Sequence, residues 1–224
     1  IWANCMWLKG VVMKAHYNGL IPRNPFIQFH ISPNVKEREY LTEDELKAVM
    51  THEFADSKLA YIRDIFIFAS FTALSFVDIQ ELTNDNIVEV NGEKWILSKR
   101  HKTKVAFQVK LLDIPLQIVE RYRPMQKDNR IFPGLNYWSI CKPLKRMIRE
   151  CGITKSISFH CSRHGFATLA LSKGMPIESV SRVLGHTNIV TTQLYAKITT
   201  QKLDNDLTMF GDKLSKTFNG ITMS

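Results

Sequence analysis

The 224-residue sequence lacks the signatures of several common protein classes. Its four cysteines, at positions 5, 141, 151 and 161, form no Cys-x-x-Cys pair, so neither a zinc site nor a disulfide framework is predicted. There is no run of about 18 apolar residues, as a membrane-spanning helix requires, and no secretory signal pattern. We therefore expect a soluble cytoplasmic protein with free thiols and no membrane partner.

Motifs that bind nucleotides or metal ions are also missing. The sequence has no Gly-rich phosphate loop with a lysine, no His-Glu-x-x-His, and no carboxylate cluster suited to two magnesium ions. The sequence therefore predicts chemistry without a metal or an organic cofactor.

Positive charge is what the sequence has in excess. Thirty Lys and Arg against 21 Asp and Glu give a formal charge of +9 and a pI near 9.4, which suits a polyanion such as double-stranded DNA. Basic residues gather at 99–104 and in a helix predicted over 136–150. The helix carries Lys142, Lys145, Arg146 and Arg149. These side chains are predicted to follow DNA phosphates, although the helix cluster could equally be a solvated face.

Three segments divide the chain. Residues 1–23 contain an apolar helix that ends near Asn18-Gly19, and residues 24–40 form a linker in which Pro25 and Pro33 break any helix. Thr42 and Glu45 form a capping box that opens the main domain, 41–224, which ends in an amphipathic tail. Because the chain starts at Ile1, we expect a fragment, with 1–23 the stub of a preceding domain.

The predicted fold is mostly α with one small antiparallel sheet, in the α+β class. Apolar periodicity indicates helices at 59–71, 115–122 and 176–184, besides the basic helix. Strands are predicted at 86–90, 93–98 and 105–111, with Asn91-Gly92 as a two-residue hairpin turn between the first two.

The segment from Ser158 to Tyr195 carries the densest chemistry. His160 and Arg163 are three residues apart, so they share a helix face and can reach one anion. Gly185 reads as the left-handed cap of a helix and places His186 on the following turn. A further helix from Asn188 through Leu194 is predicted to hold Tyr195 at the edge of its buried face. Each residue taken alone is more often a packing or surface residue.

Together these residues resemble the catalytic core of the tyrosine recombinases, the phage integrase family. The resemblance is carried by Phe159–Thr168, Leu184–Asn188 and Thr191–Tyr195, and it extends from Leu41 to about Ile198. It implies that Tyr195 attacks a DNA phosphate, that Arg163, His160 and His186 hold that phosphate, and that the phosphotyrosine link conserves bond energy without a cofactor.

The sequence departs from the family at one position. In the family the first catalytic arginine follows a Thr-Gly-Leu turn, and here Thr72-Ala73-Leu74 leads to Ser75. Some integrases of mobile elements in the Bacteroides group resemble this chain in that departure. A hydroxyl supplies one neutral hydrogen-bond donor where a guanidinium would supply a charged pair of donors. Either the catalytic activity is strongly reduced or another cationic residue replaces the arginine, and Ser75 itself is expected to contact the DNA phosphate. In the family an acidic residue near this position steadies the site, but Asp78 and Glu81 fit a solvated helix face or an ion pair at least as well and are left out of the catalytic set.

The third strand follows a basic turn. By resemblance Lys102 is the general acid that protonates the departing 5′ oxygen, and Lys104 is the fallback. Arg100 shares the parity of both along an extended chain, so we hypothesise that Arg100 reaches the phosphate in place of the missing arginine. The alternative is that Arg100 is an exposed residue touching the DNA backbone.

The sequence predicts a site-specific DNA recombinase, the integrase of a mobile element, acting through a 3′-phosphotyrosyl intermediate. The resemblance further implies a bacterial, nucleoid-associated homotetramer on DNA, with DNA-bending accessory proteins. The C-terminal tail of the main domain is expected to pack either on a neighbouring protomer or on its own domain. Two alternatives remain: a catalytically inactive DNA-binding relative, suggested by Ser75, and a type IB topoisomerase, against which the short sheet and the linker argue.

Overall fold

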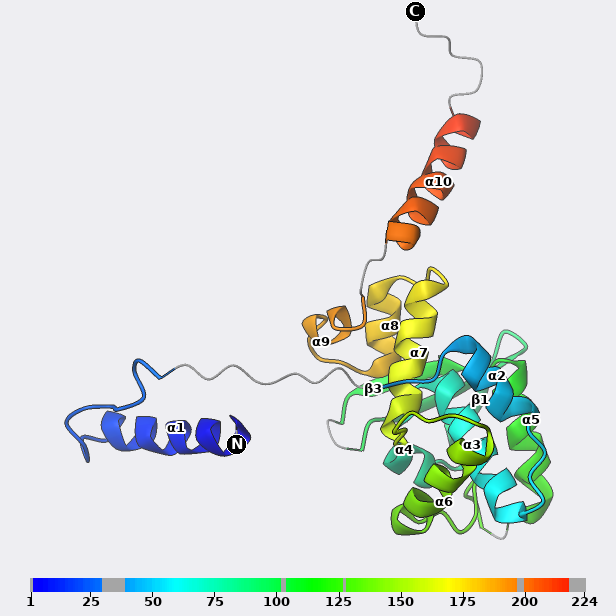
Figure 1. Ribbon diagram of the computed structural model, residues 1–224, viewed down its shortest axis with the longest axis horizontal. Coiled ribbons are helices and arrows are strands. Elements are labelled where there is room, and N and C mark those ends of the chain that lie inside the picture. Colours follow the sequence, from blue (N-terminus) through cyan, green and yellow to red (C-terminus); the bar gives the residue numbers. More distant parts are fainter. Residues whose placement is uncertain (1, 30–38, 102–103, 127, 197–199, 218–224) are drawn as a thin grey trace, which may run out of the picture. The chain divides into compact units, whose positions relative to one another are not determined.

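The computed structural model describes residues 2–29, 39–101, 104–126, 128–196 and 200–217. The chain divides into two compact units, residues 1–38 and 39–224 (Figure 1). The first unit consists of helix α1 (Trp2–Tyr17) and a turn in which the Phe26 amide donates to Asn24 Oδ1 at 2.9 Å. Most apolar side chains of α1 are exposed, with Trp7 at 72%.

The second unit confirms the prediction of a mostly helical fold with a small antiparallel sheet. Its elements in chain order are α2 (Glu43–Thr51), α3 (Ser57–Thr72), α4 (Phe76–Gln80), the 3-10 turn η1 (Asn84–Asn86), β1 (Ile87–Val90), β2 (Glu93–Lys99), β3 (Ala106–Lys110), α5 (Asp113–Tyr122), the 3-10 turn η2 (Arg123–Met125), α6 (Tyr137–Glu150), α7 (His160–Ser172), α8 (Ile177–Leu184), α9 (Val190–Gln193) and α10 (Thr200–Thr217).

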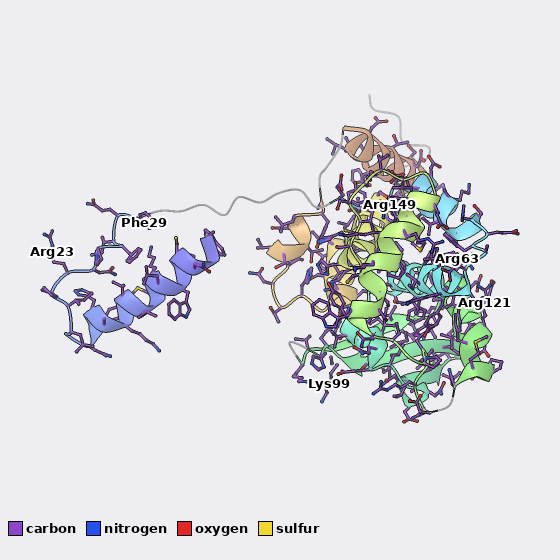
Figure 2. The ribbon with its side chains drawn as sticks, turned by 60° about the horizontal axis from the view of Figure 1, so that its bottom comes forward. Arg23, Phe29, Arg63, Lys99, Arg121 and Arg149 are labelled. Atoms are coloured by element: carbon purple, nitrogen blue, oxygen red, sulfur yellow. The ribbon has the colours of Figure 1, made fainter. Side chains whose placement is uncertain are left out.

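Helix α3 lies at the centre of the second unit. It is apolar on nearly every side, and α2, α5, α6 and α7 all pack against it. Phe68, which is fully buried, packs edge-to-face on Phe132 with ring centroids 4.9 Å apart. The one charged group in the buried part of α3, Asp64, accepts hydrogen bonds from Arg63 and Arg121, both labelled in Figure 2, and from Tyr122, so its charge is satisfied.

The three strands form a sheet of order β1-β2-β3, antiparallel throughout. Asn91 and Gly92 have φ of 53° and 76°, the left-handed pair that a two-residue hairpin turn needs, so the predicted hairpin is confirmed. Ile96, Phe107 and Val109 bury one face of the sheet. After β2 the backbone closes a tight turn, in which the Arg100 amide donates to the Val105 carbonyl at 2.8 Å.

Polar residues of α4, α7 and α8 lie near the turn after β2, and they lie at or close to the ends of these helices. Helix α3 ends at Ala73, whose φ of 56° is left-handed, and the chain reverses into α4. Helix α7 packs against α3 and α8, and α8 packs against β3. None of the helices in the described ranges combines the length and apolar content that crossing a membrane requires.

The packing of α3 predicts a strong dependence of stability on Phe68. We expect Phe68→Ala to lower the free energy of unfolding by about 3–5 kcal/mol, because a fully buried ring leaves a cavity that the rigid helices around it cannot fill. Trp138→Ala serves as the control, since that side chain is 83% exposed and its loss should change stability by less than about 0.5 kcal/mol. Urea unfolding followed by circular dichroism measures both, and equal losses would contradict this account of the core.

Candidate functional site

A cleft of about 250 Å³ lies where α4, α6 and α7 begin. His160, the first residue of α7, and Arg163, one turn later, both line it, as the spacing predicted. Ser75 lines the same cleft from the start of α4. Residues more than 80 positions apart in the sequence are thus brought to one opening.

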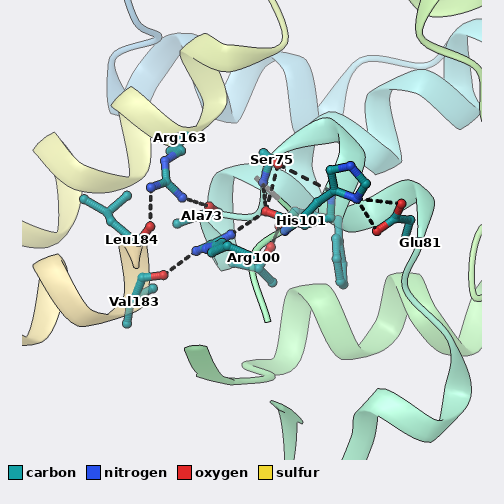
Figure 3. A network of polar contacts seen from close by, with 11 residues as sticks. Ala73, Ser75, Glu81, Arg100, His101, Arg163, Val183 and Leu184 are labelled. Carbon is teal, nitrogen blue, oxygen red and sulfur yellow. Dashed lines mark hydrogen bonds and ion pairs between the residues drawn. The ribbon is translucent and has the colours of Figure 1, made fainter. Parts of the chain in front are cut away.

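Two backbone carbonyls hold the Arg163 side chain. Its Nη1 donates to the carbonyl of Ala73 at 2.8 Å, and its Nη2 donates to the carbonyl of Leu184 (Figure 3). Those carbonyls belong to the ends of α3 and α8, where helix carbonyls lack partners within the helix. Arg163 therefore joins three helices while its charge stays uncompensated by any carboxylate that contacts it in the described structure.

Arg100 is a second buried guanidinium beside Arg163. Its side chain forms an ion pair with Asp78, with Nη1 2.7 Å from Oδ2, and its Nη2 donates to the Val183 carbonyl (Figure 3). The guanidinium carbon lies 4.1 Å from the centre of the Phe107 ring, a cation–π contact. Arg100 is only 5% exposed, so the alternative of an exposed basic residue is wrong. Its Nε is a buried side-chain nitrogen without a hydrogen-bond partner in the described structure.

Asp78 organises the groups around Arg100. The Ser75 hydroxyl donates to Asp78 Oδ2 at 2.7 Å and caps α4, while the His101 amide donates to Oδ1 at 3.0 Å. Burial raises the pKa of Asp78, but the hydrogen bonds from His101, Arg100 and Ser75 outweigh it and leave the pKa below its usual value. Asp78 therefore remains a carboxylate, and Ser75 directs its hydroxyl hydrogen at Asp78.

The third donor, His186, follows a left-handed turn as predicted. Gly185 has a φ of 62° at the end of α8, and the next residue, His186, places Nδ1 2.8 Å from Oγ1 of Thr192. Burial, together with repulsion from Arg163, Arg100 and His160, lowers the pKa of His186 to about 4. The imidazole is therefore neutral near pH 7.

Tyr195 lies just after α9, with its ring near a histidine of α7. Its ring is 5.2 Å from that of His164, which is itself 4.6 Å from the ring of His160. Burial and the Arg100 charge lower the pKa of Arg163 to about 10, while Tyr195 and Asp78 act in the opposite direction. The predicted residues Arg100, Arg163 and His186 are thus within electrostatic reach of one another, and Arg163 is also within reach of Tyr195, in a site with excess positive charge. Binding an anion would relieve that repulsion.

Other predicted residues lie elsewhere. Lys102 is outside the described residues. Lys104 is exposed, with a left-handed φ of 57°, and its amide donates to the Arg100 carbonyl at 2.8 Å. The parity argument that grouped Arg100 with Lys104 is wrong, because hydrogen bonds join Arg100 to Lys104 and to Val105, which are therefore not successive residues of one extended strand with it.

The basic helix α6 is only partly available to a ligand. Lys142 and Lys145 are exposed, as is Arg149, whose Nε donates to the Lys145 carbonyl at 3.2 Å. Arg146 forms ion pairs with Glu150 and Asp56, so its charge is compensated. The described structure brings none of the four into the cleft.

The helix that carries Tyr195 differs from the prediction. Helix α9 covers only Val190–Gln193, and the apolar residues expected to face the core are exposed, Leu194 at 66%. The buried side chain is instead Thr192. Apolar spacing could not reveal this, because a polar residue that bonds to His186 anchors the turn. Asp78 was similarly left out, since only the fold shows that its partner is Arg100.

In the described part of the chain no three His, Cys, Asp or Glu side chains are placed to hold a metal ion. The polar groups of the site are cationic or neutral donors grouped around one carboxylate, a set suited to an oxyanion such as a phosphate.

Comparison with known proteins gives consistent matches. Residues 39–202 match the model of the phage integrase family. Tyrosine recombinase XerA of Pyrococcus horikoshii is 32% identical over 177 residues, covering 73% of this chain and 58% of the relative. Tyrosine recombinase XerD of Listeria innocua is 26% identical over 204 residues, covering 84% of this chain and 67% of the relative. The chain thus spans between about three-fifths and two-thirds of these two relatives.

Solved structures share the fold. The Tn1549 transposon integrase, in complex with a circular intermediate DNA, matches with a TM-score of 0.76 and 18% identity over 90% of this chain and 76% of that chain. The XerH site-specific recombinase, bound to its palindromic difH substrate, matches with a TM-score of 0.63 and 22% identity over 79% of this chain and 54% of that chain.

The buried ion pair predicts how stability responds to loss of Asp78. We expect Asp78→Ala to lower the free energy of unfolding by about 3–5 kcal/mol, because it leaves the Arg100 charge buried without its carboxylate. Glu81→Ala is the matched control one turn away, since its pair with His101 is half exposed and should contribute about 1 kcal/mol or less. Urea denaturation at pH 7 measures both.

The pH dependence has a defined sign. Because the folded-state pKa of Asp78 is depressed, its contribution is present above the pKa of an unfolded aspartate and is lost as the pH falls through the folded pKa. The stability difference between the wild-type protein and Asp78→Ala should therefore shrink on acidification below about pH 4. A difference that stays constant would contradict the assignment.

Proposed function

The chain belongs to the phage integrase family, and on that premise we propose that it is a tyrosine-type site-specific DNA recombinase that integrates or excises a mobile element. The observation that carries the proposal is the grouping of Arg163, His186 and Arg100 within electrostatic reach of one another in one site, with Tyr195 within reach of Arg163. DNA is the proposed substrate because matched recombinases and integrases are described in complex with DNA.

Tyr195 is the proposed nucleophile. Its phenolic oxygen forms a bond to the scissile phosphorus and releases its proton to water, while the bond from phosphorus to the 5′ oxygen breaks. The product is a 3′-phosphotyrosyl link with a free 5′ hydroxyl. Attack by a free 5′ hydroxyl of another strand reverses these steps and rejoins the DNA without an external energy source.

Arg163, His160, His186 and Arg100 hold the phosphate in this proposal. Charge gathers on the non-bridging oxygens during attack, and fixed donors stabilise it because they need no reorganisation. Arg163 and Arg100 are held in place by the carbonyls of Ala73, Leu184 and Val183, so their positions are set before DNA binds.

Arg100 replaces the arginine that the family carries at the position of Ser75. The proposal is supported by its place beside Arg163 and by its Nε, a buried donor for which a phosphate oxygen would be a partner. Ser75 acts on the phosphate only indirectly, because its hydroxyl donates to the carboxylate that orients Arg100. The same departure supports the likeness to integrases of Bacteroides-group elements.

Lys102 is proposed as the general acid that gives a proton to the departing 5′ oxygen, on the resemblance alone, with Lys104 as the fallback. The exposed residues Lys142, Lys145 and Arg149 are proposed to contact DNA phosphates outside the cleft, with Arg146 added if DNA displaces its carboxylate partners. A homotetramer on DNA, DNA-bending accessory proteins and association with a bacterial nucleoid complete the proposal.

A trapping assay tests the nucleophile. Nicked suicide substrates that carry the element's end are incubated with the wild-type chain and with Tyr195→Phe, without metal, and the products are separated under denaturing conditions. We expect a covalent protein–DNA adduct with the wild-type chain only. Salt-sensitive DNA binding without any adduct would overturn the recombinase proposal in favour of a catalytically inactive DNA-binding relative.

The role of Arg100 predicts a large effect on cleavage. Adduct formation by Arg100→Ala should be slower by about a hundredfold or more, because a preorganised donor to the transition state is lost. Lys110→Ala removes a partly exposed lysine paired with Glu93 on the neighbouring strand and should cleave at the wild-type rate. Equal rates for the two variants would show that Arg100 does not hold the phosphate.

A second pair of variants tests the role of Arg100 without removing its side chain, and so applies even if Arg100→Ala does not fold. A Cβ added to Gly185 would lie 3.0 Å from Cγ and Nε of Arg100, so Gly185→Ala should displace that side chain and slow cleavage. Gly174→Ala carries the same penalty of a left-handed backbone, with a φ of 87°, but its Cβ would meet nothing within 4 Å. Equal cleavage by these two variants would contradict the proposal for Arg100.

A further inference from the structure

Thr192 is a polar side chain buried in the helix that precedes Tyr195. It is 0% exposed, whereas the other side chains of that four-residue helix are exposed. Its hydroxyl lies 2.8 Å from Nδ1 of His186. The buried side chain of this turn is therefore hydrogen-bonded to a residue of the proposed site.

The direction of that hydrogen bond follows from burial. If His186 donated from Nδ1, the Thr192 hydroxyl hydrogen would need another acceptor, and none is found for it in the described part of the chain. A buried donor without a partner costs about 1–3 kcal/mol. If the hydroxyl donates to Nδ1, both atoms of this hydrogen bond are satisfied, and the proton of the neutral imidazole resides on Nε2.

We propose that Thr192 is a positioning residue that fixes His186 as the tautomer with its proton on Nε2, so that His186 donates this hydrogen to a non-bridging oxygen of the scissile phosphate. The inference rests on the proposed function, because it assigns a role to the proposed phosphate site. His186 at neutral pH carries only one N–H, so the position of that hydrogen decides whether the imidazole can serve as a donor.

The same residue also relates His186 to the nucleophile. The Tyr195 amide donates to the Thr192 carbonyl at 3.0 Å, so the backbone of Thr192 is tied to Tyr195 and its side chain to His186. A change of the Thr192 side chain keeps this carbonyl, so it displaces His186, a group proposed to act on the phosphate, while the backbone link to Tyr195 stays. Misplacement of such groups by about 1 Å can cost about a hundredfold in rate.

The test compares three substitutions on one turn. Thr192→Val removes the hydroxyl at nearly constant volume, Thr192→Ser keeps it, and Thr191→Val changes the exposed neighbour without touching His186. Cleavage of the suicide substrate should slow by about 10–100-fold in Thr192→Val, by analogy with the loss found when the partner that orients a metal-bound histidine is removed. Thr192→Ser should restore most of the rate, Thr191→Val should match the wild type, and DNA affinity should be unchanged in all three.

A spectroscopic readout separates this role from simple packing. In two-bond ¹H–¹⁵N spectra of the DNA-free protein, His186 should appear as the Nε2–H tautomer in the wild type and in Thr192→Ser, and as a mixture in Thr192→Val. If thermal unfolding shows that the valine variant does not fold, Thr192→Ala removes the same hydroxyl with less bulk. An Nδ1–H tautomer in the wild type, or full activity without the hydroxyl, would overturn the inference.

A double-mutant comparison tests whether Thr192 acts through His186. In a His186→Phe background, Thr192→Val should slow cleavage no further, since the group that it orients is already absent. An additional 10–100-fold loss would assign Thr192 a separate role and overturn the proposal. If the wild-type chain forms no covalent adduct, the proposed function fails, yet the tautomer spectra still show whether Thr192 sets the state of His186.

Discussion

The burial of two neighbouring guanidinium groups is the constraint on which the site depends. Burial lowers the pKa of both Arg100 and Arg163, and the Arg100 charge lowers the pKa of Arg163 further. The fold offsets this cost mainly with carbonyls at helix ends, from Ala73 at the end of α3 and from Val183 and Leu184 at the end of α8. Helix C-termini carry partial negative charge, so they stabilise cations without neutralising them.

Asp78 is the one carboxylate that contacts this pair in the described structure, and it pairs with Arg100 alone. The site therefore keeps a net positive charge while each guanidinium remains fixed. The arrangement also explains why three distant segments must be folded before the site exists. The turn after β2 supplies Arg100, the start of α4 supplies Asp78, and α7 supplies Arg163. Loss of any one of these contacts would leave a buried charge without its partner.

Much of this could be predicted from the sequence, because strong local patterns specify it. The hairpin at Asn91-Gly92, the capping box of Thr42 and the left-handed cap at Gly185 each follow from backbone chemistry within a few residues. The burial of Arg100 could not be predicted, since it depends on a turn that breaks strand parity and on Asp78, 22 residues earlier. The burial of Thr192 could not be predicted either, because the buried side chain of that turn is a polar one that forms a hydrogen bond to His186.

The contact between Ser75 and Asp78 also constrains how such a site can evolve. Ser75 caps α4 and orients the carboxylate that holds Arg100, so the serine and the distant arginine work as one unit. An arginine at position 75 would remove the cap and add a third guanidinium near Arg100 and Arg163. Replacement of this one serine would therefore disturb the carboxylate and both guanidinium groups at once.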